Sequence, residues 1–173
     1  MAKSKPVISN LNDLLTYEYS KFTDFEQGLK QELPGWILQA NSLKLKTILH
    51  RYLYYAEQHF KQVESLVDGK VAGSHVKNGK TIEMIIEDIN DKLSVCADPE
   101  VKDACLLAAI QAINHYKISM YGTAASFANA LDLKKVAKLF YAAEVSEKQI
   151  DKRLSELAEQ EVNHRAKVPL ALT

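Results

Sequence analysis

Asn114, His115 and Lys117 interrupt an otherwise apolar segment of the sequence, CLLAAIQAINHYKISMYGTA at 105–124. Their amide, imidazole and ammonium groups can form charge-assisted hydrogen bonds, exchange protons or, for the histidine, ligate a metal ion. These residues alone do not specify a reaction. Their meaning depends on the polar residues that neighbouring helices place beside them.

Three further polar residues, Glu18, His59 and Glu147, lie within the apolar stripes of other predicted helices. A carboxylate buried there needs a partner, because an unpaired buried charge costs much free energy. Two explanations are open. In the first, these three residues ligate a metal ion, with His115 as an alternative or additional ligand. In the second, Lys117 supplies the positive charge and forms a buried ion pair with Glu18 or Glu147.

The spacing of the acidic residues and histidines favours the ion pair. Metal sites in helical bundles use Glu-x-x-His pairs, because residues three apart share a helix face. The only such pair here, Glu161 and His164, lies in the last turn before KVPLALT, and chain ends are commonly poorly ordered. A lone histidine on an inner face is more often hydrogen-bonded than metal-bound. The sequence therefore predicts no metal and no other cofactor.

Sequence motifs of common enzyme classes are absent. The chain contains no glycine-rich phosphate loop, no GxSxG turn and no HExxH helix. We therefore expect a non-enzymatic protein. The alternative is a metal-dependent oxidoreductase or peroxide-handling protein, which requires the four candidate ligands to converge on one point.

The composition is that of a single globular domain, which we expect to span residues 1–173 with an ordered core over about 9–164. Of the 173 residues, 47% are hydrophobic and 25% are charged. The 22 basic residues balance the 22 acidic ones, so no net charge favours nucleic acid or an anionic membrane as a partner.

Cysteine usage and the absence of a long apolar run predict a cytoplasmic protein. Cys96 and Cys105 have neither metal-type spacing nor the density of a disulfide scaffold, so we expect buried thiols in a reducing compartment. The N-terminal MAKSKPVISN lacks the apolar region of a signal peptide, and no run approaches the roughly 20 apolar residues of a membrane helix.

Sparse glycines and prolines separate five segments with helical periodicity, which predicts an all-α bundle of four long helices and one short helix. Asn10 can cap the first helix, Thr81 the short third one and Asp98 the fourth. A loop at 69–80 contains His75, which we expect to be solvated. The predicted helices cover 11–32, 41–68, 82–96, 99–129 and 136–164, the first ending at LPGW.

Residues 101–140, VKDACLLAAIQAINHYKISMYGTAASFANALDLKKVAKLF, resemble the YciE/YciF-type ferritin-like proteins of bacteria. The resemblance is carried by an Asp-Ala start, an alanine-rich turn, an HYxIxxYGT core and a KKxAKL opening of the last helix. The other predicted helices match in order and approximate length. The resemblance implies a ferritin-like antiparallel four-helix bundle with an additional short helix, a homodimer, a stress-associated role and a carboxylate metal site between helices.

The implied metal site does not carry over to the residues present. Where the family reads Glu-His-Tyr-Glu on the central helix, this chain reads NHYK at 114–117, and where it reads Leu-Glu-Glu-Thr, this chain reads LYYA at 53–56. The positions that match former ligands are Phe22, Tyr54, Tyr55, Asn114, Lys117 and Ala142. A metal pair needs several anionic oxygens, and an ammonium group repels cations. We therefore predict that the di-metal site has been lost from all four helices.

A small-molecule pocket in the same place is a further alternative, lined by Phe22, Tyr54, Tyr55 and Asn114. Aromatic side chains fill such space more readily than they open it, because protein cores are closely packed. The sequence thus predicts a divergent ferritin-like bundle acting as a non-enzymatic stress-associated or interaction protein, with no partner assigned beyond a second copy of the chain.

Overall fold

The computed structural model describes residues 7–70 and 80–167, and within these ranges the secondary structure is helical, without strands. The long helices are α1 (Leu11–Gln39), α2 (Leu43–Lys70), α4 (Pro99–Ala130) and α5 (Lys134–Leu157), and α3 (Lys80–Val95) is shorter. A π-helical turn, η1 (Ala158–Val162), and a single turn, α6 (Asn163–Ala166), follow α5.

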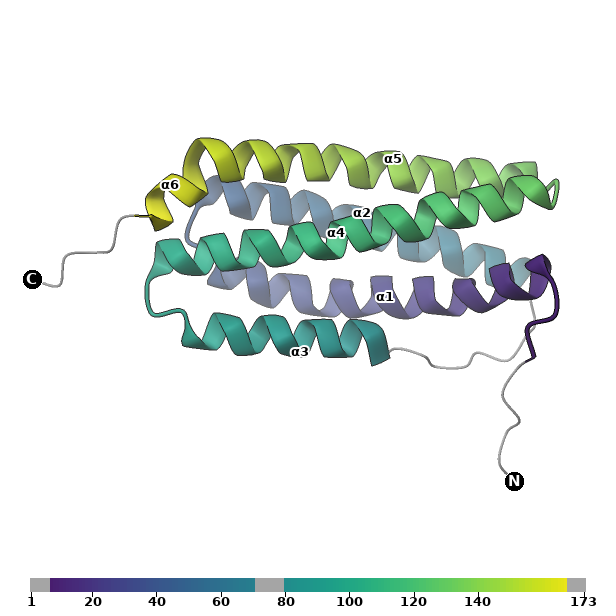
Figure 1. Cartoon of the computed structure of the whole chain (residues 1–173), viewed down its shortest axis with the longest axis horizontal. Helices are drawn as coiled ribbons and strands as arrows, with labels where there is room; N and C mark the ends of the chain where they lie inside the picture. The colour runs from purple at the N-terminus through teal and green to yellow at the C-terminus, as the bar shows by residue number, and fades with distance from the viewer. Residues whose placement is uncertain (1–6, 71–79, 168–173) are drawn as a thin grey trace, which may run out of the picture.

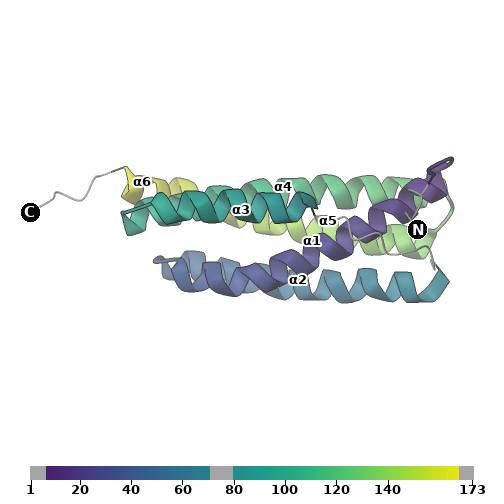
Figure 2. The ribbon, with the colours of Figure 1, turned by 90° about the horizontal axis from the view of Figure 1, so that it is seen from below.

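The four long helices form an antiparallel bundle, in which α1 and α5 run opposite to α2 and α4 (Figure 1). The short helix α3 lies outside the four, along α1 and α4. Figure 2 shows α2 on the side of the bundle away from α3. The predicted all-α, ferritin-like architecture with one additional short helix is confirmed.

Two predicted helix starts are confirmed by side-chain caps. Asn10 Oδ1 accepts a hydrogen bond from the amide of Asp13 at 2.9 Å at the start of α1. Asp98 Oδ1 accepts from the amides of Glu100 and Val101 at 2.8 and 3.1 Å at the start of α4. These contacts satisfy amide groups that have no partner within the helix.

The first helix extends past Pro34 to Gln39, so the prediction that LPGW ends it is wrong. An internal proline removes one helical hydrogen bond and costs about 3 kcal/mol. Packing of the next turn offsets this cost, because Trp36 is fully buried and its indole Nε1 donates to Asn90 Oδ1 of α3 at 2.8 Å. The turn after the proline is therefore held by tertiary contacts that helix-breaker rules do not consider.

Other boundaries differ from the prediction by smaller amounts. The short helix begins at Lys80, so Thr81 lies inside it instead of capping it. The predicted His75 lies outside the described residues. The predicted interruption at 130–135 is confirmed by the connection between α4 and α5.

The core consists of two apolar clusters at opposite ends of the bundle. One contains Trp36 and Leu49 near the α1–α2 connection, and the other contains Phe22 and Phe140 near the α4–α5 connection. On α2, α4 and α5, buried polar residues lie between the residues of the two clusters, and on α1 the buried Glu26 lies one turn after Phe22, at the boundary of the two clusters. A layer of polar side chains, which we call the polar layer, therefore crosses the middle of the core.

Two predictions from composition can be compared with the fold. Cys96 and Cys105 are free thiols, but each is half-buried instead of buried as predicted. Among the helices described here, none has the length and apolarity needed to cross a membrane.

Candidate functional site

Four helices each contribute one buried ionisable side chain to the polar layer. Glu26 comes from α1, His59 from α2, Lys117 from α4 and Glu147 from α5, with exposed fractions of 1, 4, 1 and 0%. Each residue occupies the inward stripe of its helix, between apolar residues of the two clusters. The amphipathic pattern that buries those apolar neighbours therefore buries the charge as well.

Lys117 lies at the centre of the layer. Its Nζ is 2.6 Å from Glu147 Oε1 and 2.9 Å from Glu26 Oε1. His59 Nδ1 approaches the same two oxygens, at 3.1 and 3.5 Å respectively. These are ion-pair distances, although Nζ and Nδ1 lack the alignment of a hydrogen bond. Charge attraction, more than directed hydrogen bonding, therefore holds these four groups together.

Neutral side chains of α4 complete the contacts to both carboxylates. The Tyr121 hydroxyl donates a hydrogen bond to Glu26 Oε1. Asn114 Nδ2 donates to Glu147 Oε2 at 2.7 Å and to the Glu147 backbone carbonyl at 3.1 Å. Each glutamate is thus bound by a neutral donor in addition to the cations, as buried carboxylates require.

Aromatic rings enclose the charged groups. Lys117 Nζ lies 4.7 Å from the centroid of the Tyr52 ring, in cation–π contact. The Tyr121 ring stacks on Phe22 with centroids 5.1 Å apart, and it meets the His59 ring edge-on at 5.3 Å. The charges are therefore surrounded by apolar surface, where electrostatic interactions are stronger than in water.

Helical spacing explains why these side chains meet. Asn114, Lys117 and Tyr121 follow one another at intervals of three and four residues, so they share one face of α4. Tyr52 and His59 are seven residues apart, which also places them on one face of α2. Two helices thus provide five of the side chains in the layer.

The carboxylate of Glu26 and the ammonium of Lys117 are both charged at neutral pH. Burial acts to raise the pKa of Glu26, but the charge of Lys117, followed by contacts from His59 and Tyr121, outweighs it, and the pKa is lowered. Burial acts to lower the pKa of Lys117, but the charges of Glu147 and Glu26 outweigh it, and the pKa is raised. Each charge therefore stabilises the other.

The pKa of His59 is also raised. Burial and the charge of Lys117 act against protonation, but the close approach of Nδ1 to the carboxylates of Glu147 and Glu26 and the charge of Glu26 prevail. With His59 protonated, two cations balance two carboxylates. Burial, followed by the charges of Glu26 and Glu147, raises the pKa of Tyr121 well above its usual value, so its hydroxyl keeps its proton and donates.

Of the four sequence-predicted ligands, the structure brings two together: His59 and Glu147 meet in the polar layer, whereas Glu18 and His115 do not. The Glu18 carboxylate instead lies 3.0 Å from Lys21 Nζ on the same helix. His115 is 65% exposed, and its Nε2 lies 2.8 Å from Asp151 Oδ1. The geometry therefore does not support one metal site built from all four residues.

The six positions that matched former ligands do not form one site. Phe22, Tyr55, Asn114 and Lys117 lie in or beside the polar layer, whereas Tyr54 and Ala142 lie outside it. Tyr54 is 56% exposed and Ala142 is exposed, so neither fills space between the helices. The four residues expected to line a pocket consequently do not enclose one.

Glu26 is the residue of the polar layer that sequence reasoning missed. It lies one turn after Phe22, the position that was matched to the family's first-helix ligand. Two buried carboxylates remain in the core, one on α1 and one on α5, although neither occupies a position that was matched to a former ligand. The sequence does contain one sign of Glu26: this residue directly follows Phe25, inside an apolar stripe of the first helix, where a buried charge needs a partner.

The donor atoms do not fit the paired-metal centre that the resemblance implies. Donor atoms of Glu26, His59 and Glu147 lie within 4.8 Å of one another, which is enough to bind one ion but poor in carboxylates for two. Lys117 Nζ contacts the same Oε1 atoms of both glutamates. A cation at that point would face a buried ammonium group at contact distance, which is strongly unfavourable.

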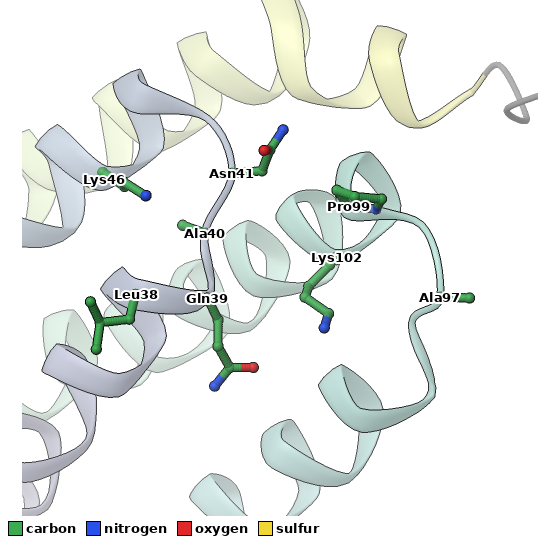
Figure 3. A pocket seen from close by; sticks show the side chains of 8 residues that line it. All are labelled: Leu38, Gln39, Ala40, Asn41, Lys46, Ala97, Pro99 and Lys102. Atoms are coloured by element: carbon green, nitrogen blue, oxygen red, sulfur yellow. The ribbon is translucent and has the colours of Figure 1, made fainter.

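Three cavities lie away from the polar layer. One, of about 370 Å³, is open between the α1–α2 connection and the start of α4, with Lys46 and Lys102 among its lining residues (Figure 3). Two others, of about 580 and 390 Å³, lie between α2 and α5 and between α1 and α3. The residues that line these cavities include none of the buried ionisable side chains.

Comparison with known proteins identifies the fold and the relatives. Residues 10–167 match the family described as "Domain of unknown function (DUF892)". The chain is 29% identical to Protein YciF of Escherichia coli (strain K12) over 161 residues, which are 92% of this chain and 96% of that protein.

Two solved structures have the same helical bundle. The crystal structure of the E. coli stress protein YciF matches with a TM-score of 0.83 and 27% identity, covering 90% of this chain and 99% of that one. YcfI from Rhodopseudomonas palustris matches with a TM-score of 0.81 and 23% identity, covering 90% and 97%. The architecture found here is therefore shared over almost the whole length of these proteins.

Proposed function

This chain belongs to the DUF892 family, and we propose that it acts as a non-enzymatic, stress-associated bundle protein whose central lysine has replaced a metal centre. The stress association is supported by the similar E. coli chain, which is described as a stress protein. The loss of metal chemistry is supported by the residues of this chain.

One observation carries the proposal: the Lys117 ammonium lies between Glu26 and Glu147, 2.9 and 2.6 Å from their Oε1 atoms. A divalent ion would need these same oxygens, because anionic ligands offset its charge. A protonated lysine supplies one positive charge there permanently, and His59 supplies a second when it is protonated. The carboxylates are consequently neutralised without an ion.

The polar layer then serves as a crosslink between helices. Its charged groups come from α1, α2, α4 and α5, and each long helix is joined to two of the others by these contacts. Such a layer disfavours slipped or rearranged helix packing, because a shift would leave a charge buried without a partner. We therefore assign the polar layer a role in specifying how the four helices pack, and we assign it no catalytic role.

Metal analysis of protein purified without chelators tests the proposal. The expected content of iron, manganese and zinc is far below one equivalent per chain, because Lys117 occupies the position that an ion would need. Stoichiometric amounts of any of these metals would contradict the proposal. A Lys117→Met sample serves as the comparison, since it retains the three donor residues without the ammonium.

A second candidate function is a metal-dependent oxidoreductase or peroxide-handling protein that uses Glu26, His59 and Glu147. The convergence of their donor atoms within 4.8 Å favours it. It requires Lys117 to lose its proton or leave the layer. Peroxide consumption by the wild-type chain with added Fe²⁺ or Mn²⁺, abolished in Glu147→Gln, would establish this function. Turnover no faster than that of the free metal would exclude it.

We also propose that the chain forms a single domain over residues 1–173, assembles as a homodimer and resides in the cytoplasm. The family match over residues 10–167 supports one domain, and two free thiols suit a reducing compartment. The balanced charge of the chain supports the absence of nucleic acid as a partner. Sedimentation equilibrium tests the dimer, and a monomer at micromolar concentrations would contradict it.

A further inference from the structure

Two cysteines flank the turn that joins α3 to α4. Cys96 follows directly after the last residue of α3, and Cys105 lies about two turns into α4. The two helices run antiparallel beside each other from this turn (Figure 1). Both thiols are free and only half-buried, so a small reagent can reach them.

The side chain of Cys105 faces the stripe of α3 that leads to Cys96. Asp88, Lys92 and Cys96 follow at intervals of four residues and therefore lie along one side of α3. Cys96 Sγ lies 3.2 Å from the Lys92 carbonyl oxygen, so the sulfur folds back along that stripe. Cys105 interacts electrostatically with all three residues and is within hydrogen-bonding reach of Cys96.

The environments of the two thiols differ. Burial, followed by the electrostatic interaction and the hydrogen bond with Cys96, raises the pKa of Cys105. Cys105 therefore stays protonated beside its neighbour, and it also packs against the apolar cluster near Leu106. Cys96 lies between the exposed residues Val95 and Ala97 and outside that cluster, which favours it as the first sulfur to react with an oxidant.

We propose that Cys96 and Cys105 are a redox pair that forms an intramolecular disulfide when the protein meets a hydroperoxide. The Cys96 thiolate sulfur attacks one peroxide oxygen, the O–O bond breaks, and an alcohol or water leaves, so Cys96 becomes a sulfenic acid. The Cys105 sulfur then attacks the Cys96 sulfur, and the sulfenic oxygen leaves as water with the Cys105 proton. The two thiols are oxidised by two electrons in total, and the peroxide is reduced.

The disulfide would link the C-terminal end of α3 covalently to α4. Among the described helices, α3 packs mainly along α1 and α4, and residues 71–79 separate it from α2 in the sequence. A covalent bond at its C-terminal end removes one route by which α3 can separate from α4. Oxidation is therefore expected to slow amide hydrogen exchange in α3 more than in α5.

Peptide mapping of the full-length protein after hydrogen peroxide treatment tests the pair. Trypsin cleaves after Lys92, Lys102 and Lys117, which places the two cysteines in separate peptides, 93–102 and 103–117. The expected product, after free thiols are blocked with N-ethylmaleimide, is these two peptides joined within one chain, and dithiothreitol should separate them. Both peptides carrying the blocking group, Cys96 oxidised alone to a sulfinic acid, or peptides joined between chains would each overturn the proposal.

Two variants control for proximity and folding. Cys105→Ser should lose the linked peptides while it keeps the helical circular dichroism spectrum of the wild type. The double variant Cys96→Ser, Ser94→Cys moves the thiol from position 96 to the exposed position 94. In the wild type, the Ser94 hydroxyl donates a hydrogen bond to the Asp91 carbonyl oxygen. This variant should not link to Cys105, and linkage as efficient as in the wild type would overturn the claim that the α3 stripe positions the pair.

Discussion

Two polar contacts join α4 to α5 at similar distances but in different surroundings. Lys117 and Glu147 approach to 2.6 Å with exposed fractions of 1 and 0%, whereas His115 and Asp151 approach to 2.8 Å with exposed fractions of 65 and 26%. Water screens the second pair, and exposed pairs contribute little to stability. In the first pair, loss of one partner leaves an uncompensated buried charge. Burial, and not distance, therefore distinguishes a residue of the polar layer from a surface residue.

Removal of the central cation should have the largest effect. Lys117→Met leaves the buried Glu26 and Glu147 with His59 as the remaining cationic partner, so we expect the free energy of unfolding to fall by about 3–5 kcal/mol. Urea denaturation measures this change. The matched control is Lys148→Met, which removes an exposed lysine 2.6 Å from Glu144 and should have little effect.

A loss below about 1 kcal/mol in Lys117→Met, equal to that of the surface control, would contradict the account. It would mean that the two glutamates do not depend on Lys117 for their charge balance. The double variant Lys117→Met with Glu26→Gln should recover part of the lost stability, because one buried negative charge is removed together with the cation.

Removal of one neutral donor should have the next largest effect. Tyr121→Phe deletes the hydroxyl that donates to Glu26 and keeps the ring that stacks on Phe22. A hydrogen bond to a charged group contributes roughly 1.5–3 kcal/mol, so a loss of this size is expected in thermal or urea unfolding. Tyr141→Phe, at a residue that is 61% exposed, is the control. Equal stability of the two variants would contradict a supporting role for Tyr121.

The pH dependence of stability should report on His59. Its pKa is raised in the folded protein above the unfolded value of about 6.5, so its proton stabilises the fold fully below that pH. This contribution is lost as the pH rises through the folded pKa. If the folded protein binds this proton ten times more tightly than the unfolded chain does, the difference corresponds to about 1.4 kcal/mol of stability. The charged groups that face the imidazole are Glu26 from α1, Lys117 from α4 and Glu147 from α5.

Unfolding free energies of the wild type and His59→Gln between about pH 6 and about pH 9 measure this effect. Wild-type stability should decline across this range, and the decline should be smaller in His59→Gln. His115→Gln, on the exposed pair, should keep the wild-type decline. Identical pH profiles for the wild type and His59→Gln would show that His59 does not bind a proton more tightly in the folded state.

The exposed pair should have the smallest effect. His115→Ala removes the contact with Asp151 at the bundle surface, and we expect a change in unfolding free energy below about 1 kcal/mol. The same assay used for Lys117→Met gives this value. A loss comparable to that of Lys117→Met would mean that burial does not separate the two pairs.

The sequence predicted the fold well because helix caps and apolar periodicity are local signals. Asn10 and Asp98 cap helices as predicted, and the helix order follows from residues close in the chain. The end of α1 was predicted wrongly because Trp36 is held by Asn90, which is 54 residues away. Periodicity along one helix contains no information about such a contact.

The polar layer was predictable only in part. Lys117, Glu147 and His59 were recognised because each interrupts an apolar stripe of its own helix. Glu26 was missed because it directly follows the apolar Phe25, and a broad helix face can bury both neighbours. Which carboxylate meets Lys117 depends on how α1 and α4 are aligned along the bundle, and this alignment is a property of the packed structure.

The replacement of a metal by Lys117 is tested most directly by titrating the wild-type chain with Mn²⁺ and Zn²⁺ while its thermal unfolding is measured. An ion bound only to the folded chain would stabilise it, by about 2.7 kcal/mol at a concentration 100 times the dissociation constant. We predict no increase in the unfolding temperature, and none after treatment with a chelator. A saturable increase that corresponds to one ion per chain and disappears in both His59→Gln and Glu147→Gln would contradict the account.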